Sequence, residues 1–135
     1  MKEYLYMAAK VALPTNDNER RRNYYLGSVG IRKDGTKVFS KNGATSDSTP
    51  VENPRYLLIP SSHAECRVLR KLGKDGVMFV ARVSKEDHVL LMARPCQMCV
   101  VKICSMGVKK VYYTVNSTQY GVFLPEDGTD RIYRF

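Results

Sequence analysis

The 135-residue sequence contains no apolar run approaching the roughly 18 residues that a transmembrane helix needs. Its first residues, Met1 to Met7, lack the hydrophobic stretch and the small-residue cleavage site of a signal peptide. Internal repeats and low-complexity tracts are also absent. We therefore expect an intracellular, cytoplasmic protein with no membrane partner. Its length predicts one domain spanning residues 1–135.

Acidic residues are scarce: 13 Asp and Glu stand against 22 Lys and Arg, which gives a net charge of +9 at pH 7. A surplus of this size favours polyanionic or phosphorylated partners. The basic residues are spread along the sequence, apart from a cluster at Arg20–Arg22 that a solvated loop explains as well as a phosphate contact. Charge alone therefore indicates the chemistry of a partner without identifying it.

Cysteines are few: Cys66, Cys96, Cys99 and Cys104. A chain of this length does not need disulfides to fold, and in the absence of an export signal we expect reduced thiols. Metal binding or catalysis is then the better interpretation of these residues.

The pattern of apolar residues predicts an α/β fold. Helices are expected over residues 2–13, 63–72 and 96–106, the last with Val100, Ile103 and Cys104 facing inward. Strands are expected over residues 25–31, 36–40, 77–83 and 108–115, with an extended run at 89–93 and a short last strand at 120–124. This order indicates a three-layer α/β/α sandwich around a mixed five-stranded sheet. The long polar stretch 43–60 is expected to border the functional site.

The residues that carry chemistry stand at two predicted helix starts. His63-Ala64-Glu65 begins one helix, and Pro95-Cys96-Gln97-Met98-Cys99 begins another. Because residues three apart lie on the same face of a helix, Cys96 and Cys99 can hold one ion together with His63. Three protein ligands leave a fourth tetrahedral position for water, as in catalytic zinc sites. Glu65 points to another side of the turn, from which it can reach that water and transfer protons.

Each motif has another interpretation when it is taken alone. A lone His-x-Glu occurs by chance in many proteins, and Pro-Cys-x-x-Cys could be half of a structural zinc site or a redox pair. The two motifs occur together here, in this order and each at a predicted helix start. That combination favours a catalytic zinc site.

The combination resembles the signature of zinc-dependent nucleobase deaminases. From about Tyr25 to Tyr113 the sequence is similar to the cytidine and deoxycytidylate deaminase superfamily. The residues after the second cysteine, Val100-Val101-Lys102 and Gly107 to Tyr113, are similar to those of deoxycytidylate deaminases. The tRNA adenosine deaminases share Pro-Cys-x-Met-Cys but usually continue with small residues. The resemblance therefore implies a cytidine deaminase-like fold and the hydrolysis of cytosine to uracil.

The resemblance also implies roles for individual residues. His63, Cys96 and Cys99 would bind Zn²⁺, Glu65 would carry protons, and no organic cofactor would be needed. The backbone amide of Ala64 would face the pyrimidine carbonyl. Asn42 matches the asparagine that family members place after the second strand to hold sugar or base, although an Asn-Gly pair also often forms a turn.

Aromatic residues near the end of the sequence could contact a base. Tyr112, Tyr113, Tyr120 and Phe123 have the chemistry of stacking residues in single-strand binders, but aromatic residues in strands are more often core. Tyr112 and Tyr113 are adjacent, so one should face in and the other out. Tyr120, in the polar segment 116–121, is the best stacking candidate.

The substrate that the resemblance favours is a small pyrimidine nucleotide, deoxycytidylate, with the enzyme expected to be a homo-oligomer. The sequence departs from deoxycytidylate deaminases in two ways: it has no recognisable second zinc cluster before His63, and the stretch 77–93 is longer than the single strand usual there. Two alternatives stay open. The chain could deaminate cytosine in single-stranded DNA or RNA, or it could be a non-catalytic zinc module that binds nucleic acid.

Overall fold

The structure is a computed structural model that describes residues 2–21, 24–42 and 64–135, with only the backbone described at residues 18 and 64–67. The helices within these ranges are α1 (Lys2–Ala12), α2 (Asp17–Arg20), α3 (Ala64–Leu72) and α4 (Gln97–Ser105). The strands are β1 (Tyr25–Ile31), β2 (Lys37–Lys41), β3 (Val77–Val83), β4 (Leu90–Leu91), β5 (Lys110–Thr114), β6 (Gln119–Leu124) and β7 (Thr129–Arg134). Among the described residues, no helix is long and apolar enough to cross a membrane.

The predicted helices are confirmed, and so are the strands predicted at 25–31 and 36–40. α1, α3 and α4 each begin and end within two residues of the predicted bounds. β1 and β2 pair as an antiparallel hairpin, and Gly35 adopts a φ of 91° in its turn, a conformation that favours glycine. The polar stretch 43–60, predicted to border the site, lies outside the described residues.

The strands form one mixed sheet in the order β2-β1-β3-β5-β6-β7, with β4 paired to β3. β3 and β5 are parallel, and the other pairs are antiparallel. The prediction of a mixed sheet is therefore confirmed, but the predicted number of five strands is wrong. β7 is an additional strand whose sequence has no alternation of apolar and polar residues that would predict it, because all six of its residues are exposed. β4, which is two residues long, accounts for the extra length between residues 77 and 93.

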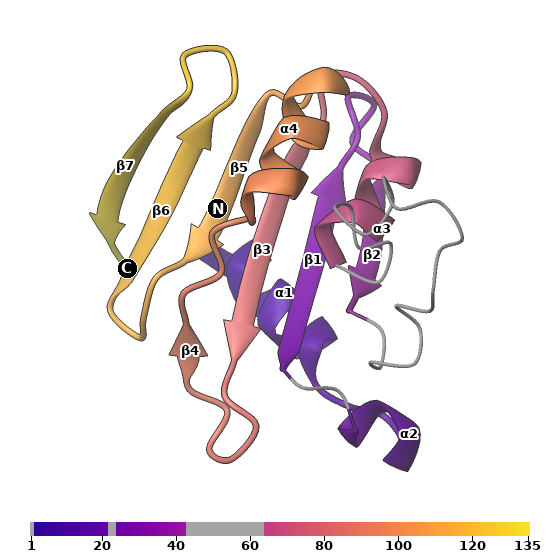
Figure 1. The fold of residues 1–135 in the computed structure, drawn as a ribbon, viewed down its shortest axis with the longest axis vertical. Helices are drawn as coiled ribbons and strands as arrows, with labels where there is room; N and C mark the ends of the chain where they lie inside the picture. The colour runs from indigo at the N-terminus through magenta and orange to yellow at the C-terminus, as the bar shows by residue number, and fades with distance from the viewer. Residues whose placement is uncertain (1, 22–23, 43–63) are drawn as a thin grey trace.

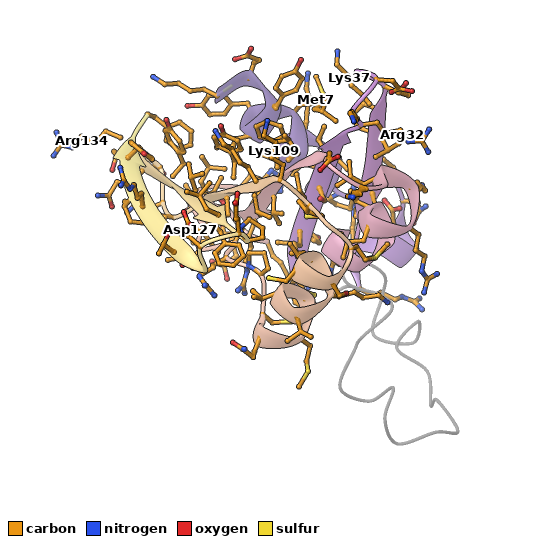
Figure 2. All side chains as sticks on the ribbon, turned by 90° about the horizontal axis from the view of Figure 1, so that it is seen from above. Met7, Arg32, Lys37, Lys109, Asp127 and Arg134 are labelled. Carbon is orange, nitrogen blue, oxygen red and sulfur yellow. The ribbon has the colours of Figure 1, made fainter. Side chains whose placement is uncertain are left out.

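The helices lie on both faces of the sheet, as Figures 1 and 2 show: α1 on one face, α3 and α4 on the other. β3 is buried from both sides, because its successive residues face opposite layers. Met78 and Val80 pack with α3 and α4, whereas Phe79 packs with α1. β1 approaches α1 so closely that a Cβ atom at Gly27 would collide with the backbone of Ala8.

One residue of α4 faces the opposite way from its prediction. Ile103 is fully buried, as predicted, and shares its face with Cys99 four residues earlier. Cys104 was predicted to face inward but is exposed. The physical reason is the helical period, which turns each residue about 100° from the one before. A helix lying on a sheet buries one stripe, and here that stripe contains Cys99 and Ile103.

Candidate metal and substrate site

The starts of α3 and α4 lie at the same end of the sheet. Their opposite ends are held together, because the amide of Asp75, just after α3, donates a 2.8 Å hydrogen bond to the carbonyl of Gly107, just after α4. Both helices have nine residues and lie on the same face of the sheet, in contact with one another (Figure 1). Two helices of equal length that end together on one face also begin near one another. The fold therefore places the start of α3, from Ala64, on the same face of the sheet and toward the same end as Cys96 and Cys99.

Two thiols stand at the start of α4. Cys96 is the N-cap residue, with extended backbone (φ −65°, ψ 164°), and its carbonyl accepts the first helical hydrogen bond, from Val100 at 2.9 Å. Cys99 follows in the first turn and is fully buried, whereas Cys96 is exposed. A helix N-terminus favours the thiolate form, which is the form that binds metal. One buried and one accessible sulfur ligand, three residues apart, suit a zinc ion at the protein surface.

The other predicted site residues belong to the start of α3. Ala64 and Glu65 are the first two residues of this helix, and the structure describes their backbone only. His63, the predicted third ligand, lies outside the described residues. Within the described part of the chain, no three His, Cys, Asp or Glu side chains come together as a metal site.

A pocket of about 160 Å³ opens beside Cys96. β1 and the residue before it contribute Leu26 and Tyr24, β3 contributes Arg82, and the segment before α4 contributes Arg94. The guanidinium of Arg82 lies 5.3 Å from the centre of the Tyr24 ring, a cation–π distance. The pocket therefore places a thiol, an aromatic ring and two positive charges around one small cavity.

A comparison with models of protein families matches residues 1–115 of the chain to the cytidine and deoxycytidylate deaminase zinc-binding region. The chain belongs to this deaminase family. A comparison with curated proteins found no match. Family membership suggests a zinc-dependent hydrolase that deaminates cytosine. It does not specify which cytosine-containing compound is the substrate. The matched region ends just after β5, so β6 and β7 lie beyond it.

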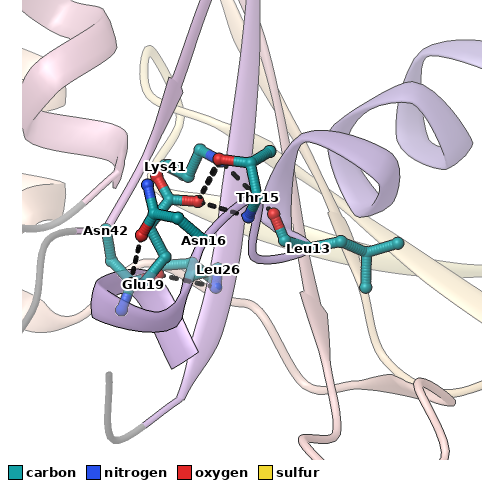
Figure 3. Close-up of polar contacts among 7 residues, drawn as sticks. All are labelled: Leu13, Thr15, Asn16, Glu19, Leu26, Lys41 and Asn42. Carbon is teal, nitrogen blue, oxygen red and sulfur yellow. Dashed lines mark hydrogen bonds and ion pairs between the residues drawn. The ribbon is translucent and has the colours of Figure 1, made fainter. Parts of the chain in front are cut away.

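Asn42, the residue that the deaminase resemblance assigned to substrate binding, fixes one wall of the pocket. Its side chain is buried; Oδ1 accepts a 2.9 Å hydrogen bond from the amide of Leu26, and Nδ2 donates a 2.8 Å hydrogen bond to the carbonyl of Tyr24. Figure 3 shows the contact with Leu26. Tyr24 and Leu26 both line the pocket beside Cys96. Asn42 therefore positions pocket residues, and its contact with substrate stays a prediction.

Sequence reasoning missed the cluster that fixes Arg94. Its Nε and Nη2 atoms each donate a 3.0 Å hydrogen bond to the carboxylate of Asp130, and the Tyr113 hydroxyl donates a third, of 2.7 Å, to the same carboxylate. The hydrogen bonds from Arg94 hold the pKa of Asp130 below its ordinary range, although burial opposes them. Burial and the bond to Asp130 raise the pKa of Tyr113 to about 12. The pocket thus keeps a charged, oriented guanidinium next to Pro95 and Cys96.

The structure does not bring Tyr120 to this pocket. Tyr120 lies within β6, which confirms the short last strand predicted at 120–124, and it packs on the α1 side of the sheet, with Phe79 and Tyr112. Cys99 packs on the other side, with Tyr113. Tyr112 and Tyr113 therefore lie on opposite faces of the sheet, as predicted, but the prediction that one of them faces out is wrong, because residues pack on both faces and both rings are buried.

A second polar cluster joins α2 to the end of β2, next to Asn42 (Figure 3). Lys41 Nζ lies 2.8 Å from Glu19 Oε1 and donates a 3.3 Å hydrogen bond to the carbonyl of Leu13. The amide and hydroxyl of Thr15 also donate to Glu19. Burial by itself would raise the pKa of Glu19, but the hydrogen bonds from Lys41 and Thr15 outweigh it and lower the pKa to about 2.

We expect this cluster to make stability depend on pH in the acid range. The pKa of Glu19 is 4.5 ordinarily and about 2 when folded, so its contribution is complete above about pH 4.5 and is lost as the pH falls toward 2. Glu19→Gln should lower the free energy of unfolding by roughly 1 to 2 kcal/mol at pH 7, and by clearly less at pH 3. Urea unfolding at both pH values measures this difference. An equal loss at both would show that the charge of Glu19 does not stabilise the fold.

Proposed function

We propose that this protein hydrolyses cytosine to uracil in a (deoxy)cytidine nucleotide, with deoxycytidylate as the substrate. The pocket beside Cys96 is the observation that carries the proposal. It places the thiol of Cys96, a proposed zinc ligand, beside Tyr24, Arg82 and Arg94. An aromatic ring and two guanidinium groups suit a substrate that has both a base and a phosphate.

The ligands in this proposal are His63, Cys96 and Cys99. The two thiols at the start of α4 fit a zinc ion in their chemistry and in their three-residue spacing. When bound, zinc would supply a water molecule whose pKa is lowered from about 16 toward 7. Glu65 would accept a proton and return protons to ring nitrogen N3 and to the departing amine, so that one water is consumed and one ammonia released. The Ala64 amide would hold the pyrimidine carbonyl.

The phosphate of the substrate would lie at the arginine side of the pocket. Asp130 holds the guanidinium of Arg94 by two hydrogen bonds, which orients it before any substrate arrives. Arg82 is exposed, and it faces the pocket from β3. Arginine presents a planar set of donors that matches phosphate geometry. A doubly negative phosphate is bound most strongly by two such groups.

Product analysis tests the reaction and the substrate together. The purified protein is incubated in turn with deoxycytidine monophosphate, cytidine and a cytosine-containing oligonucleotide, and the products are separated. We expect ammonia and deoxyuridine monophosphate to form fastest from the mononucleotide. Conversion of the oligonucleotide alone would contradict the proposed substrate. Bound zinc without ammonia from any of the three would contradict deamination itself and favour a non-catalytic zinc module.

Arg82→Gln is expected to raise the KM for deoxycytidine monophosphate about tenfold, because a charge-assisted hydrogen bond to phosphate is worth roughly 1.5 kcal/mol or more. The KM for cytidine, which carries no phosphate, should change little. Steady-state kinetics with both substrates measure this split. Arg70→Gln is the matched control, since Arg70 is an exposed arginine in the last turn of α3. Equal changes for both substrates would place the phosphate elsewhere.

A further inference from the structure

The α1 side of the sheet has an open part beyond the deaminase family match. α1 packs mainly on β1 and β3, and the described part of the chain places no helix over β6 and β7 on that side (Figures 1 and 2). A hollow of about 290 Å³ lies there, and strands β5, β6 and β7 form its floor. Five of the seven residues that line it, Tyr120, Val122, Leu124, Arg131 and Tyr133, come after residue 115, where the match ends. The family's matched region therefore leaves most of this surface unexplained.

A row of tyrosines crosses the hollow. The Tyr120 ring stacks on the Tyr133 ring, with centroids 5.5 Å apart and an angle of 25° between the planes. The Tyr112 ring lies 6.5 Å from Tyr120 on the inner side. Tyr133, on the edge strand, is 43% exposed. The row is thus buried at one end and open at the other, where a flat ring could continue the stack.

The charges at the same hollow are all positive. Lys110 and Arg131 line it, and no Asp or Glu is among its lining residues. The strand register explains the placement: Tyr112 pairs with Val122, and Val122 pairs with Arg131, so these side chains share one face. Lys110 shares it too, because it lies two residues before Tyr112. We refer to Lys110, Tyr120, Arg131 and Tyr133 as the tyrosine–arginine face.

We propose that the tyrosine–arginine face binds single-stranded nucleic acid, with a base stacked on Tyr133, at the open end of the row that Tyr120 supports, and phosphates at Lys110 and Arg131. Stacking on aromatic rings beside a positively charged groove is how single strands are bound without sequence preference. A duplex keeps its bases stacked on one another and does not offer them to such rings. The proposal does not depend on deamination, because this face lies on the opposite side of the sheet from Cys99.

A second copy of the chain is a less suitable occupant of this face. A two-fold contact would place the Lys110 and Arg131 side chains of one copy against those of the other. Like charges in direct opposition are destabilising, and the chain as a whole carries a net charge of +9. Negatively charged phosphates neutralise the same two residues, so charge complementarity favours nucleic acid.

Fluorescence anisotropy with a labelled oligothymidylate of about twelve nucleotides tests the proposal on the full chain. This probe contains no cytosine, so the measurement does not depend on deaminase activity. We expect Tyr133→Ala to raise the dissociation constant about tenfold and Tyr133→Phe, which keeps the ring, to change it little. Arg131→Gln should weaken binding several-fold and lower the slope of log affinity against log salt by about one. The charge-matched control is Arg134→Gln, on the same strand but three residues from Arg131 and therefore on its other face.

Several results would overturn the proposal. Absence of oligothymidylate binding at low salt is the simplest. Net charge alone would account for the binding if the corresponding duplex bound with equal affinity. The same conclusion would follow if Arg131→Gln and Arg134→Gln lost equal affinity. Competition by thymidine monophosphate at the affinity of the oligonucleotide would show a mononucleotide site instead. Self-association that Tyr133→Ala abolishes, without oligonucleotide binding, would identify a second copy as the occupant. Failure of deoxycytidylate turnover would contradict the proposed function and leave this inference standing.

Discussion

Glu65→Gln is expected to reduce the rate of cytosine deamination by at least about a hundredfold, while zinc stays bound. Glutamine has nearly the size of glutamate but cannot accept a proton, and a positioned acid or base contributes roughly 100- to 10,000-fold. The substitution stands in the first turn of α3 and leaves the proposed ligands in place. Ammonia release from deoxycytidine monophosphate measures kcat, and elemental analysis measures zinc.

Glu86 provides the matched control for this experiment. It is an exposed glutamate in the turn between β3 and β4. Glu86→Gln should retain native turnover and native zinc content. If Glu65→Gln also keeps near-native turnover, another group carries the proton. If it loses zinc, the carboxylate belongs to the metal site itself rather than to the water beside it.

The features that could be predicted from the sequence are local ones. Ser61 and Ser62, residue types that cap helices, precede α3, and Pro95 precedes α4; both helices end before glycines, Gly73 and Gly107, whose positive φ angles terminate them. The first five residues of β3, 77–81, are all apolar because both faces of the strand are covered there. Signals of this kind depend on a few neighbouring residues, so one sequence suffices to find them.

The features that could not be predicted depend on contacts between distant parts of the chain. Arg94 and Asp130 are 36 residues apart, and nothing in the sequence around either residue indicates the pair. β7 shows no alternation of apolar and polar residues, because it is an edge strand and all of its residues are exposed. The strand predicted at 120–124 is confirmed, but the sequence does not indicate that Tyr120 faces away from Cys99, because the register of β6 with β5 and β7 decides its face.

The β6–β7 hairpin connects these observations to the site. It lies beyond the part of the chain that matches the deaminase family, and yet its Asp130 holds Arg94 beside Cys96. The Tyr113 hydroxyl, from the matched β5, completes the same cluster. The hairpin therefore supports the proposed phosphate side of the pocket from one face of the sheet, and it presents the tyrosine–arginine face from the other.

Cys99→Ser is expected to lower zinc affinity by more than about a hundredfold and to remove deaminase activity, since even partners outside the ligand set are worth roughly 10- to 100-fold. Serine offers a hydroxyl where zinc prefers a thiolate. Cys99 is fully buried, so the substitution also disturbs packing. Cys96→Ser separates the two effects, because Cys96 is exposed and its loss should remove zinc with little change in packing.

The control on the same helix is Cys104→Ser. Cys104 is exposed and lies in the last turn of α4, away from the start where the other two thiols stand. This variant should keep its zinc, its activity and its thermal stability. Elemental analysis after dialysis against a weak chelator compares the three proteins directly. If both Cys96→Ser and Cys99→Ser retain zinc, α4 does not contribute ligands to the metal site. The proposed mechanism would then lose the ligands on which it depends.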